Sequence, residues 1–427
     1  MSDFTPSPQQ AQAMAQIKDW FLHRTKQQQV FRVIGYAGTG KTTVIKHTAR
    51  ELNLNQPKDG GRYGDILYAA YTGKAALVMT RKGTPASTIH SLIYRVSDTS
   101  PQEIERLQEE IAVIRVSLSA LAGEEELFAK ARLRRLETRL QNAHQPSFVL
   151  NAESPLCAAK LLVLDEVSMV GKEMAQDLLS FGKPILVLGD PGQLPPIKSE
   201  GAFVDGVPDV MLTDIHRQAG ESAIIRLATL ARQGSYIPYG KHDDFVWKMR
   251  VNDVAPAQML KGGQVICGRN LTRLWLNTAL KQADGFPAIY PEGCGEKIIC
   301  LKNRNDLGIV NGMFLELSDL RDEDHLSFSA RITTEDGEEL DGRHSFYKGH
   351  FDDHVRLDKD RLSRDWQQVR RLVESTWGYA ITCHKAQGSQ WENVIVYDDH
   401  LCRSEDDQRR WLYTAITRAE KGLVILD

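Results

Sequence analysis

The 427-residue sequence is poor in cysteine, and the cysteines that it has do not form a framework. The six stand apart at positions 157, 267, 294, 300, 383 and 402, without a C-x-x-C pair. This spacing argues against a disulfide scaffold and against a zinc site, and it is typical of a protein from a reducing compartment. The fold must therefore be stabilised by hydrophobic cores.

Long apolar runs and a strong net charge are also missing. No stretch approaches the roughly 18 apolar residues of a membrane span, and the start, MSDFTPSPQQ, lacks the pattern of a signal peptide. The formal net charge is −3, so any nucleic-acid binding must use a local groove rather than a global basic field. With 42 % hydrophobic residues, a chain of this length is sufficient for two or three domains.

Short apolar runs that alternate with helical segments predict an α/β fold. Runs of strand length occupy 30–35, 65–70, 160–167 and 184–190, and helical patterns occupy 8–22 and 41–53. Near-continuous apolar strands in this rhythm indicate a parallel sheet covered on both faces. The runs at 392–399 and 422–427 return to the same pattern and predict a second α/β lobe.

Two segments interrupt this rhythm. Within 101–141 apolar residues recur in alternating steps of three and four, with a break at 123–126, which predicts an antiparallel helical hairpin inserted into the first lobe. The hairpin either packs on its own domain or projects as an arm. Within 291–371 short alternating segments and the Asn311-Gly312 turn predict a small antiparallel β domain inserted into the second lobe.

The segment GYAGTGKT at 35–42 predicts a nucleotide site. It matches G-x-x-x-x-G-K-[ST] and lies between an expected strand and an expected helix. Backbone N–H groups of such a loop surround phosphates, while Lys41 reaches the β and γ oxygens and Thr42 offers its hydroxyl to Mg²⁺. We expect ATP and Mg²⁺ as ligands, with further loop contacts from Gly35, Gly38, Thr39, Gly40 and Thr43.

Two later strand ends supply the expected partners of this loop. In LLVLDEVSM at 161–169, Asp165 is suited to hold Mg²⁺ and Glu166 to accept a proton from the attacking water. In GDPGQLPPI at 189–197, the prolines and glycines predict a rigid turn. Because carboxyl ends of parallel strands meet at one rim, Gln193 is a candidate sensor of the γ-phosphate. Alternatively, the glutamine only fills the turn.

The order of these motifs resembles superfamily 1 DNA helicases of the RecD/Dda type, from about residue 10 to residue 418. The resemblance implies two RecA-like parallel-sheet lobes around one ATP. It implies a first lobe at 1–205 with the helical insertion at about 97–147, a second lobe at 206–290 and 372–427, and an SH3-like β insertion at 291–371.

The resemblance also implies roles for particular residues. Gln10 in SPQQAQA would read adenine, with Gln9 as the alternative. Arg217 in LTDIHRQ and Arg418 in YTAITRA would contact the γ-phosphate from the second half of the chain, which would place ATP between two lobes. Gly388 would lie at the nucleotide. The implied contacts to single-stranded DNA are Thr72, Lys74, Thr88, His90, Thr382, His384 and Lys385.

The activity implied by the resemblance is ATP-dependent unwinding of DNA, with 5′→3′ movement on single-stranded DNA. Expected partners are single-stranded DNA, forked duplex DNA and replication or recombination proteins, without a membrane partner. We expect a monomer in the cytoplasm of a bacterial or phage-infected cell. Two alternatives stay open: a helicase-like subunit of an ATP-dependent nuclease complex, and a P-loop switch that does not unwind. The hydrolytic set of Lys41, Glu166, Arg217 and Arg418 argues against the switch.

Overall fold

A computed structural model describes residues 4–57, 63–97, 101–118, 126, 129–130, 132–137, 147–195, 202–203, 207–214, 222–293, 295–357, 368–400 and 404–427. The chain forms two compact units. One contains Met1–Ile89 and Ala158–Asp427, and the other contains His90–Cys157. Within the described ranges, no helix has both the length and the apolar character that crossing a membrane requires.

The first sheet has six strands, all parallel, in the order β3-β2-β6-β7-β1-β8. β2 and β7 are buried along their whole length, as expected of a sheet covered on both faces. The strands are β1 (Val30–Gly35), β2 (Ile66–Ala70), β3 (Ala86–Thr88), β6 (Leu161–Asp165), β7 (Ile185–Gly189) and β8 (Val210–Leu212). The helices of this lobe are α1 (Pro8–His23), α2 (Lys41–Glu51), α3 (Gly73–Arg81) and α7 (Lys172–Ser180). The prediction of a parallel sheet is confirmed.

β8 corrects one boundary. It pairs in parallel with β1, with Val210 opposite Val33, so the first sheet continues beyond residue 205, where we had placed the end of the first lobe. The strand is three residues long, which is too short for a hydrophobic pattern to predict.

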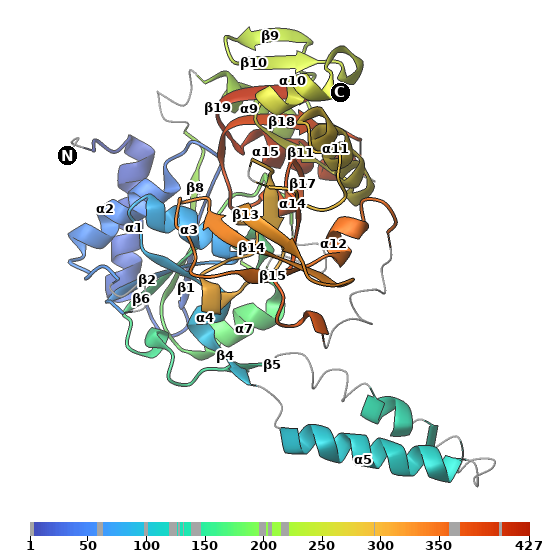
Figure 1. Ribbon diagram of the computed structural model, residues 1–427. Helices are drawn as coiled ribbons and strands as arrows, with labels where there is room; N and C mark the ends of the chain where they lie inside the picture. The colour runs from blue at the N-terminus through green and yellow to red at the C-terminus, as the bar shows by residue number, and fades with distance from the viewer. Residues whose placement is uncertain are drawn as a thin grey trace. The chain divides into compact units, whose positions relative to one another are not determined.

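The second sheet has the order β17-β11-β18-β19-β10-β9, and its strands are parallel except for the edge strand β9. Figure 1 shows yellow strands from the middle of the chain beside red strands from its end. The strands are β9 (Gly240–Asp243), β10 (Val246–Met249), β11 (Gln264–Cys267), β17 (Ala380–Thr382), β18 (Trp391–Tyr397) and β19 (Ala419–Leu426). The helices are α9 (Ala223–Gln233), α10 (Pro256–Lys261), α11 (Asn270–Ala283), α14 (Cys383–Ala386) and α15 (Glu405–Ile416).

The third sheet is antiparallel, with the order β15-β14-β13-β12-β16. It contains β12 (Ile298–Cys300), β13 (Phe314–Asp322), β14 (Ser327–Thr334), β15 (His344–Tyr347) and β16 (Ser375–Trp377). The helix α12 (Gly349–Asp352) lies between β15 and β16 in the chain, and β17 of the second sheet follows β16. The antiparallel pattern was predicted, but its end at 371 was wrong, because β16 pairs with β12. Only two residues separate β16 from β17, and so short a connection does not mark a domain boundary in the sequence.

The unit His90–Cys157 contains a two-stranded antiparallel ribbon and a long helix. The ribbon pairs β4 (Tyr94–Ser97) with β5 (Ser147–Leu150) and follows α4 (Ile89–Ile93), while α5 spans Pro101–Ser117. Leu107, Ile111 and Ile114 of α5 pack against Leu136, so the apolar steps do mark a buried helix face. Most of the break at 123–126 and the end of the second helical run lie outside the described residues, so the hairpin itself stays a prediction.

Candidate nucleotide site

The P-loop connects the end of β1 to the start of α2. Gly38 and Gly40 both have φ of 79°, a left-handed conformation that residues with a Cβ rarely adopt. The loop lines a cavity of about 450 Å³. The cavity brings together most of the predicted nucleotide residues, namely Gly38, Gly40, Lys41, Thr42, Thr43, Asp165, Glu166, Gln193, Gly388 and Arg418.

Lys41 is the first residue of α2, and its side chain turns back onto the P-loop. Its Nζ donates to the carbonyl oxygens of Gly35, at 2.7 Å, and Tyr36, at 3.0 Å. The Tyr36 oxygen also accepts a hydrogen bond of 2.9 Å from the Thr39 hydroxyl. The ammonium group is therefore held on backbone oxygens at the positive end of α2, where phosphate oxygens are favoured ligands.

Asp165, at the end of β6, faces the P-loop. Thr42 donates to its Oδ2 at 3.3 Å, and the backbone N–H of Glu166 donates to its Oδ1 at 2.8 Å. Burial, and then the charge of Glu166, raise the pKa of Asp165 to about 6. A hydroxyl and a carboxylate at this spacing are oxygen ligands of the kind that Mg²⁺ prefers. Glu166 itself has φ of 52°, a strained conformation for a residue other than glycine.

The Gln193 side chain lies between the carboxylate of Glu166 in the first lobe and the guanidinium of Arg418 in the second lobe. The amide orientation that satisfies its neighbours directs its nitrogen to Glu166 Oε2, at 3.1 Å, and its oxygen to Arg418 Nη2, at 3.3 Å. Arg418 Nη1 lies 4.0 Å from Glu166 Oε1. The glutamine amide has an NH2 group that donates and a carbonyl oxygen that accepts, so it can bind a carboxylate and a guanidinium at once, as neither an acidic nor a basic side chain could. The Gln193 side chain therefore contacts both lobes, and its role as a sensor of the γ-phosphate stays a prediction.

Arg418 is 3 % exposed, and the second lobe fixes its direction. Its guanidinium donates to the carbonyl oxygens of Thr414, at 3.1 Å, and Ser389, at 3.3 Å. The structure thus brings Arg418 to the cavity that the P-loop lines. Arg217 lies outside the described residues, so its position stays a prediction.

Two residues that sequence reasoning missed join the lobes beside this cavity. The hydroxyl of Tyr413, on α15, donates to Asp190 Oδ2 at 2.7 Å and accepts from the N–H of Ala37 at 2.8 Å. Burial raises the pKa of both Asp190 and Tyr413. The position of Asp190 directly after a buried strand could have marked it as a candidate site residue, but nothing in the sequence indicates its contact with Tyr413.

The two candidate glutamines of α1 occupy different places. Gln10 is 3 % exposed, and its Nε2 donates to the Thr39 carbonyl at 3.0 Å, so its amide contacts the P-loop. Gln9 binds the segment after β8: its Nε2 donates to the Met211 carbonyl and its Oε1 accepts from the N–H of Thr213. Gln10 is the better placed of the two for a contact beside the P-loop.

The predicted DNA residues Thr72 and Thr382 occupy equivalent positions in the two sheets. Thr72 lies two residues after β2 and Thr382 is the last residue of β17, and each is the N-cap of the helix that comes next. A Cβ at Gly388 would lie 2.6 Å from that of Ala75, so the loop after α14 contacts the start of α3. Thr88 ends β3, at the same edge of the first sheet.

The predicted lysines are more buried than a surface contact to DNA would suggest. Burial, and then the charge of Arg273, lower the pKa of Lys385 to about 8, and its Nζ lies 3.3 Å from Asn311 Oδ1. Lys74 is 7 % exposed, and its ammonium pairs with Glu335 of the antiparallel sheet region. The structure therefore holds Lys74 in an ion pair.

The two predicted histidines belong to different units of the chain. His90 belongs to the unit His90–Cys157, where its ring contacts those of Tyr94, at 5.8 Å, and Phe148, at 5.9 Å. Burial lowers the pKa of both His90 and His384. Both rings are therefore favoured in the neutral form at neutral pH.

The P-loop, the Asp165–Glu166 pair and the facing Arg418 are the parts of a P-loop nucleoside triphosphatase. A family profile described as an AAA domain matches residues 5–242, more than half of the chain, and a profile described as a UvrD-like helicase C-terminal domain matches residues 378–426. The chain therefore belongs to the AAA-domain family. Together the two matches confirm the relationship to superfamily 1 helicases.

Among curated proteins, the chain is similar to an ATP-dependent RecD2 DNA helicase of Deinococcus radiodurans, with 24 % identity over 294 residues. The match covers 61 % of this chain and 35 % of the relative, so the chain spans about a third of that protein. Among solved structures it is similar to Pif1 helicases. One, from a study of unwinding at forked DNA, has a TM-score of 0.52 and 18 % identity; another, from Bacteroides with ADP-AlF3 and single-stranded DNA, has 0.51 and 17 %. Each covers 99 % of this chain and 92 % of its own. This likeness shows the fold.

Proposed function

We propose that this protein is an ATP-dependent DNA helicase that moves on single-stranded DNA in the 5′→3′ direction. The observation that carries the proposal is the position of Gln193, whose amide contacts Glu166 of one lobe and Arg418 of the other beside the P-loop. The names of the relatives, which include a DNA helicase and Pif1 helicases with single-stranded or forked DNA, support DNA as the substrate. The polarity comes from the resemblance to the RecD/Dda type.

In this proposal the chain's own groups perform the hydrolysis. Lys41 leaves the carbonyl oxygens of Gly35 and Tyr36 for the β and γ oxygens of ATP. Thr42 and Asp165 would hold Mg²⁺, which would neutralise part of the phosphate charge. Glu166 accepts the proton of the attacking water, and Arg418, with Arg217, stabilises the charge that develops on the γ-phosphate.

The DNA path would cross the carboxyl ends of both sheets. Thr72 and Thr382 are helix N-caps at those ends, where hydroxyl and N–H groups bind phosphates without reading bases. Lys385 adds a cation at the second sheet. Because Gly388 contacts the start of α3, closure of the lobes on ATP would move the two halves of this path together. We infer a monomer that acts on forked DNA and works with replication or recombination proteins.

The test is the rate of ATP hydrolysis with and without single-stranded DNA or RNA, followed by unwinding of duplexes with 5′ or 3′ tails. The expected result is hydrolysis stimulated by DNA and unwinding of the 5′-tailed duplex, with both lost in Lys41→Ala. Unwinding of only the 3′-tailed duplex would contradict the polarity. Shortened DNA strands with Mg²⁺ but without ATP would instead support a nuclease.

The insertions receive separate roles in this proposal. The unit His90–Cys157 is compact in its own right, which supports an arm that separates strands, and the antiparallel sheet is assigned as an SH3-like domain of the second lobe. Deletion of 101–141 should then impair unwinding and spare DNA-stimulated hydrolysis. Equal loss of the two activities would contradict the role of the arm.

A further inference from the structure

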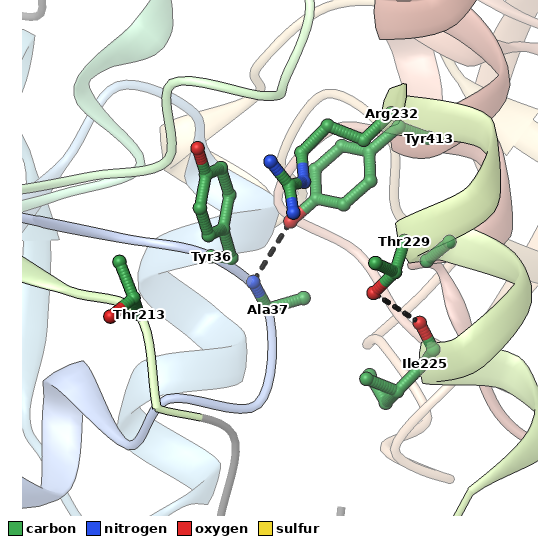
Figure 2. Close-up of a pocket in the computed structure, with 8 residues that line it drawn as sticks. Tyr36, Ala37, Thr213, Ile225, Thr229, Arg232 and Tyr413 are labelled. Carbon is green, nitrogen blue, oxygen red and sulfur yellow. Dashed lines mark hydrogen bonds between the residues drawn. The ribbon is translucent and has the colours of Figure 1, made fainter. Parts of the chain in front are cut away.

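Arg232 of the second lobe reaches across to the P-loop of the first. It lies in the last turn of α9, which packs along α15, and its guanidinium carbon lies 3.7 Å from the centre of the Tyr36 ring. Figure 2 shows the guanidinium directed at this ring, beside the hydrogen bond that joins Ala37 to Tyr413. A guanidinium stacked on an aromatic face at this distance is a cation–π contact.

Tyr36 is well placed to transmit this contact to the P-loop backbone. Its carbonyl oxygen accepts from Lys41 Nζ at 3.0 Å and from the Thr39 hydroxyl at 2.9 Å. The ring that Arg232 stacks on and this carbonyl oxygen belong to one residue, so a shift of the Tyr36 backbone would move the oxygen and loosen the first turn of the P-loop.

The space beside the stack gives Tyr36 room to move. A cavity of about 320 Å³ lies there, and its lining includes Thr213, Ile225 and Thr229. Arg232 is therefore the contact that closes one face of the ring. The aliphatic part of the Arg232 side chain also contacts the loop that carries Gln193, since a Cβ added at Gly192 would lie 3.2 Å from Arg232 Cδ.

We propose that Arg232 is a positioning residue for ATP binding. It clamps the Tyr36 ring, and through Tyr36 it holds the backbone of the first P-loop turn in the shape that the triphosphate requires, so that Lys41 can move from the Tyr36 carbonyl to the phosphates. The clamp rests on the proposed ATP site. It adds a contact from the second lobe to the P-loop that does not involve the γ-phosphate, and it assigns a role to a residue outside the motifs.

The test compares Arg232→Ala, Arg232→Lys, Tyr36→Leu and Tyr36→Phe by titration with a fluorescent ATP analogue and by ATP hydrolysis at saturating single-stranded DNA. A cation–π contact at a partly exposed site corresponds to roughly a five-fold change in affinity. Arg232→Ala and Tyr36→Leu should each raise Kd and KM for ATP about 3- to 10-fold and change kcat less than about two-fold. Lysine should restore part of the loss, and phenylalanine, which keeps the ring, should restore most of it.

The double variant Arg232→Ala/Tyr36→Leu decides whether the two act as one contact. It should be no worse than either single variant, since the stack can be lost only once. Arg226→Ala is the matched control, because Arg226 lies on the same helix but binds the His242 carbonyl at 3.2 Å, and it should bind ATP as the wild type does. Wild-type affinity in Arg232→Ala, or additive losses in the double variant, would overturn the clamp. Failure of the wild type to bind ATP would overturn the proposed function as well.

Discussion

Replacing Gln193 by alanine tests how the two lobes cooperate in hydrolysis. The variant loses the hydrogen bonds of 3.1 Å to Glu166 and 3.3 Å to Arg418. A hydrogen bond to a charged group contributes about 1.5–3 kcal/mol. Because water in the open cavity can replace part of the two lost hydrogen bonds, we estimate the total loss as that of one such bond. Each 1.4 kcal/mol is about ten-fold in rate, so kcat with DNA should fall roughly 10- to 100-fold.

A second effect acts in the same direction. Arg418 Nη1 already lies 4.0 Å from Glu166 Oε1, and without the amide between them the two can pair directly. A carboxylate that is paired with a guanidinium is a weaker proton acceptor, because the positive charge of its partner stabilises the ionised form. Affinity for ATP should stay within about three-fold of the wild type, since the phosphate contacts of Lys41 and Thr42 do not involve Gln193.

The assay measures steady-state hydrolysis across ATP concentrations, with and without single-stranded DNA, together with the Kd for ATP. Gln193→Met is the matched control for packing, because methionine keeps the length of the side chain but forms neither hydrogen bond. It should be as defective as Gln193→Ala. Normal DNA stimulation in the alanine variant, or recovery in the methionine variant, would refute the reasoning.

Three further predictions follow from single groups. The pKa of Asp165 is raised to about 6, so the folded state binds this proton more tightly than the unfolded state does, and the free energy of unfolding should fall as the pH rises from about 4 to 6. The affinity for Mg²⁺–ATP should change in the opposite direction and fall below pH 6, because the protonated carboxyl binds Mg²⁺ poorly. In titrations of Asp165→Asn, this pH dependence of affinity should be lost. Tyr413→Phe removes a hydrogen bond to the buried Asp190 and should lower the free energy of unfolding by about 1.5–3 kcal/mol in urea denaturation; a loss below about 0.5 kcal/mol would contradict the bond. Lys385, with a pKa of about 8, should lose its charge between about pH 7 and 9, so DNA affinity measured by anisotropy at constant salt should fall there and should stay level in Lys385→Arg.

The strands that the sequence predicted are those with enough buried residues to form a pattern. β1, β2, β6 and β7 are each five or six residues long and nearly all apolar, which is what a sheet covered on both faces requires. β8 and β16 are three residues long and owe their strand conformation to one partner each, β1 and β12. Pairing of this kind depends on the tertiary structure, which local pattern does not report.

At the nucleotide site too, the sequence predicted the residues of a contiguous motif but not those brought together by tertiary contacts. Lys41 and Thr42 were predictable because a P-loop is contiguous, and the backbone between two glycines determines where the side chains lie. Tyr413 and Arg232 were not, since each contacts residues almost 200 or more positions away in the chain. Lys74 was predicted from a resemblance that could not reveal its ion pair with Glu335.

The glycine of the Gln193 loop explains how closely the lobes meet there. A Cβ at Gly192 would lie 2.8 Å from Tyr413 Cε1, so a side chain at this position would push α15 away. With glycine, Tyr413 binds both Asp190 of this loop and Ala37 of the P-loop, while the Thr414 hydroxyl accepts from the Leu194 N–H at 3.0 Å. One helix of the second lobe therefore holds both first-lobe loops that face the triphosphate. The buried hydrogen bond between Tyr413 and Asp190 can break but cannot stretch far. Movement of the second lobe must therefore either carry the Gln193 loop along, which moves Gln193 relative to Glu166, or release that loop altogether.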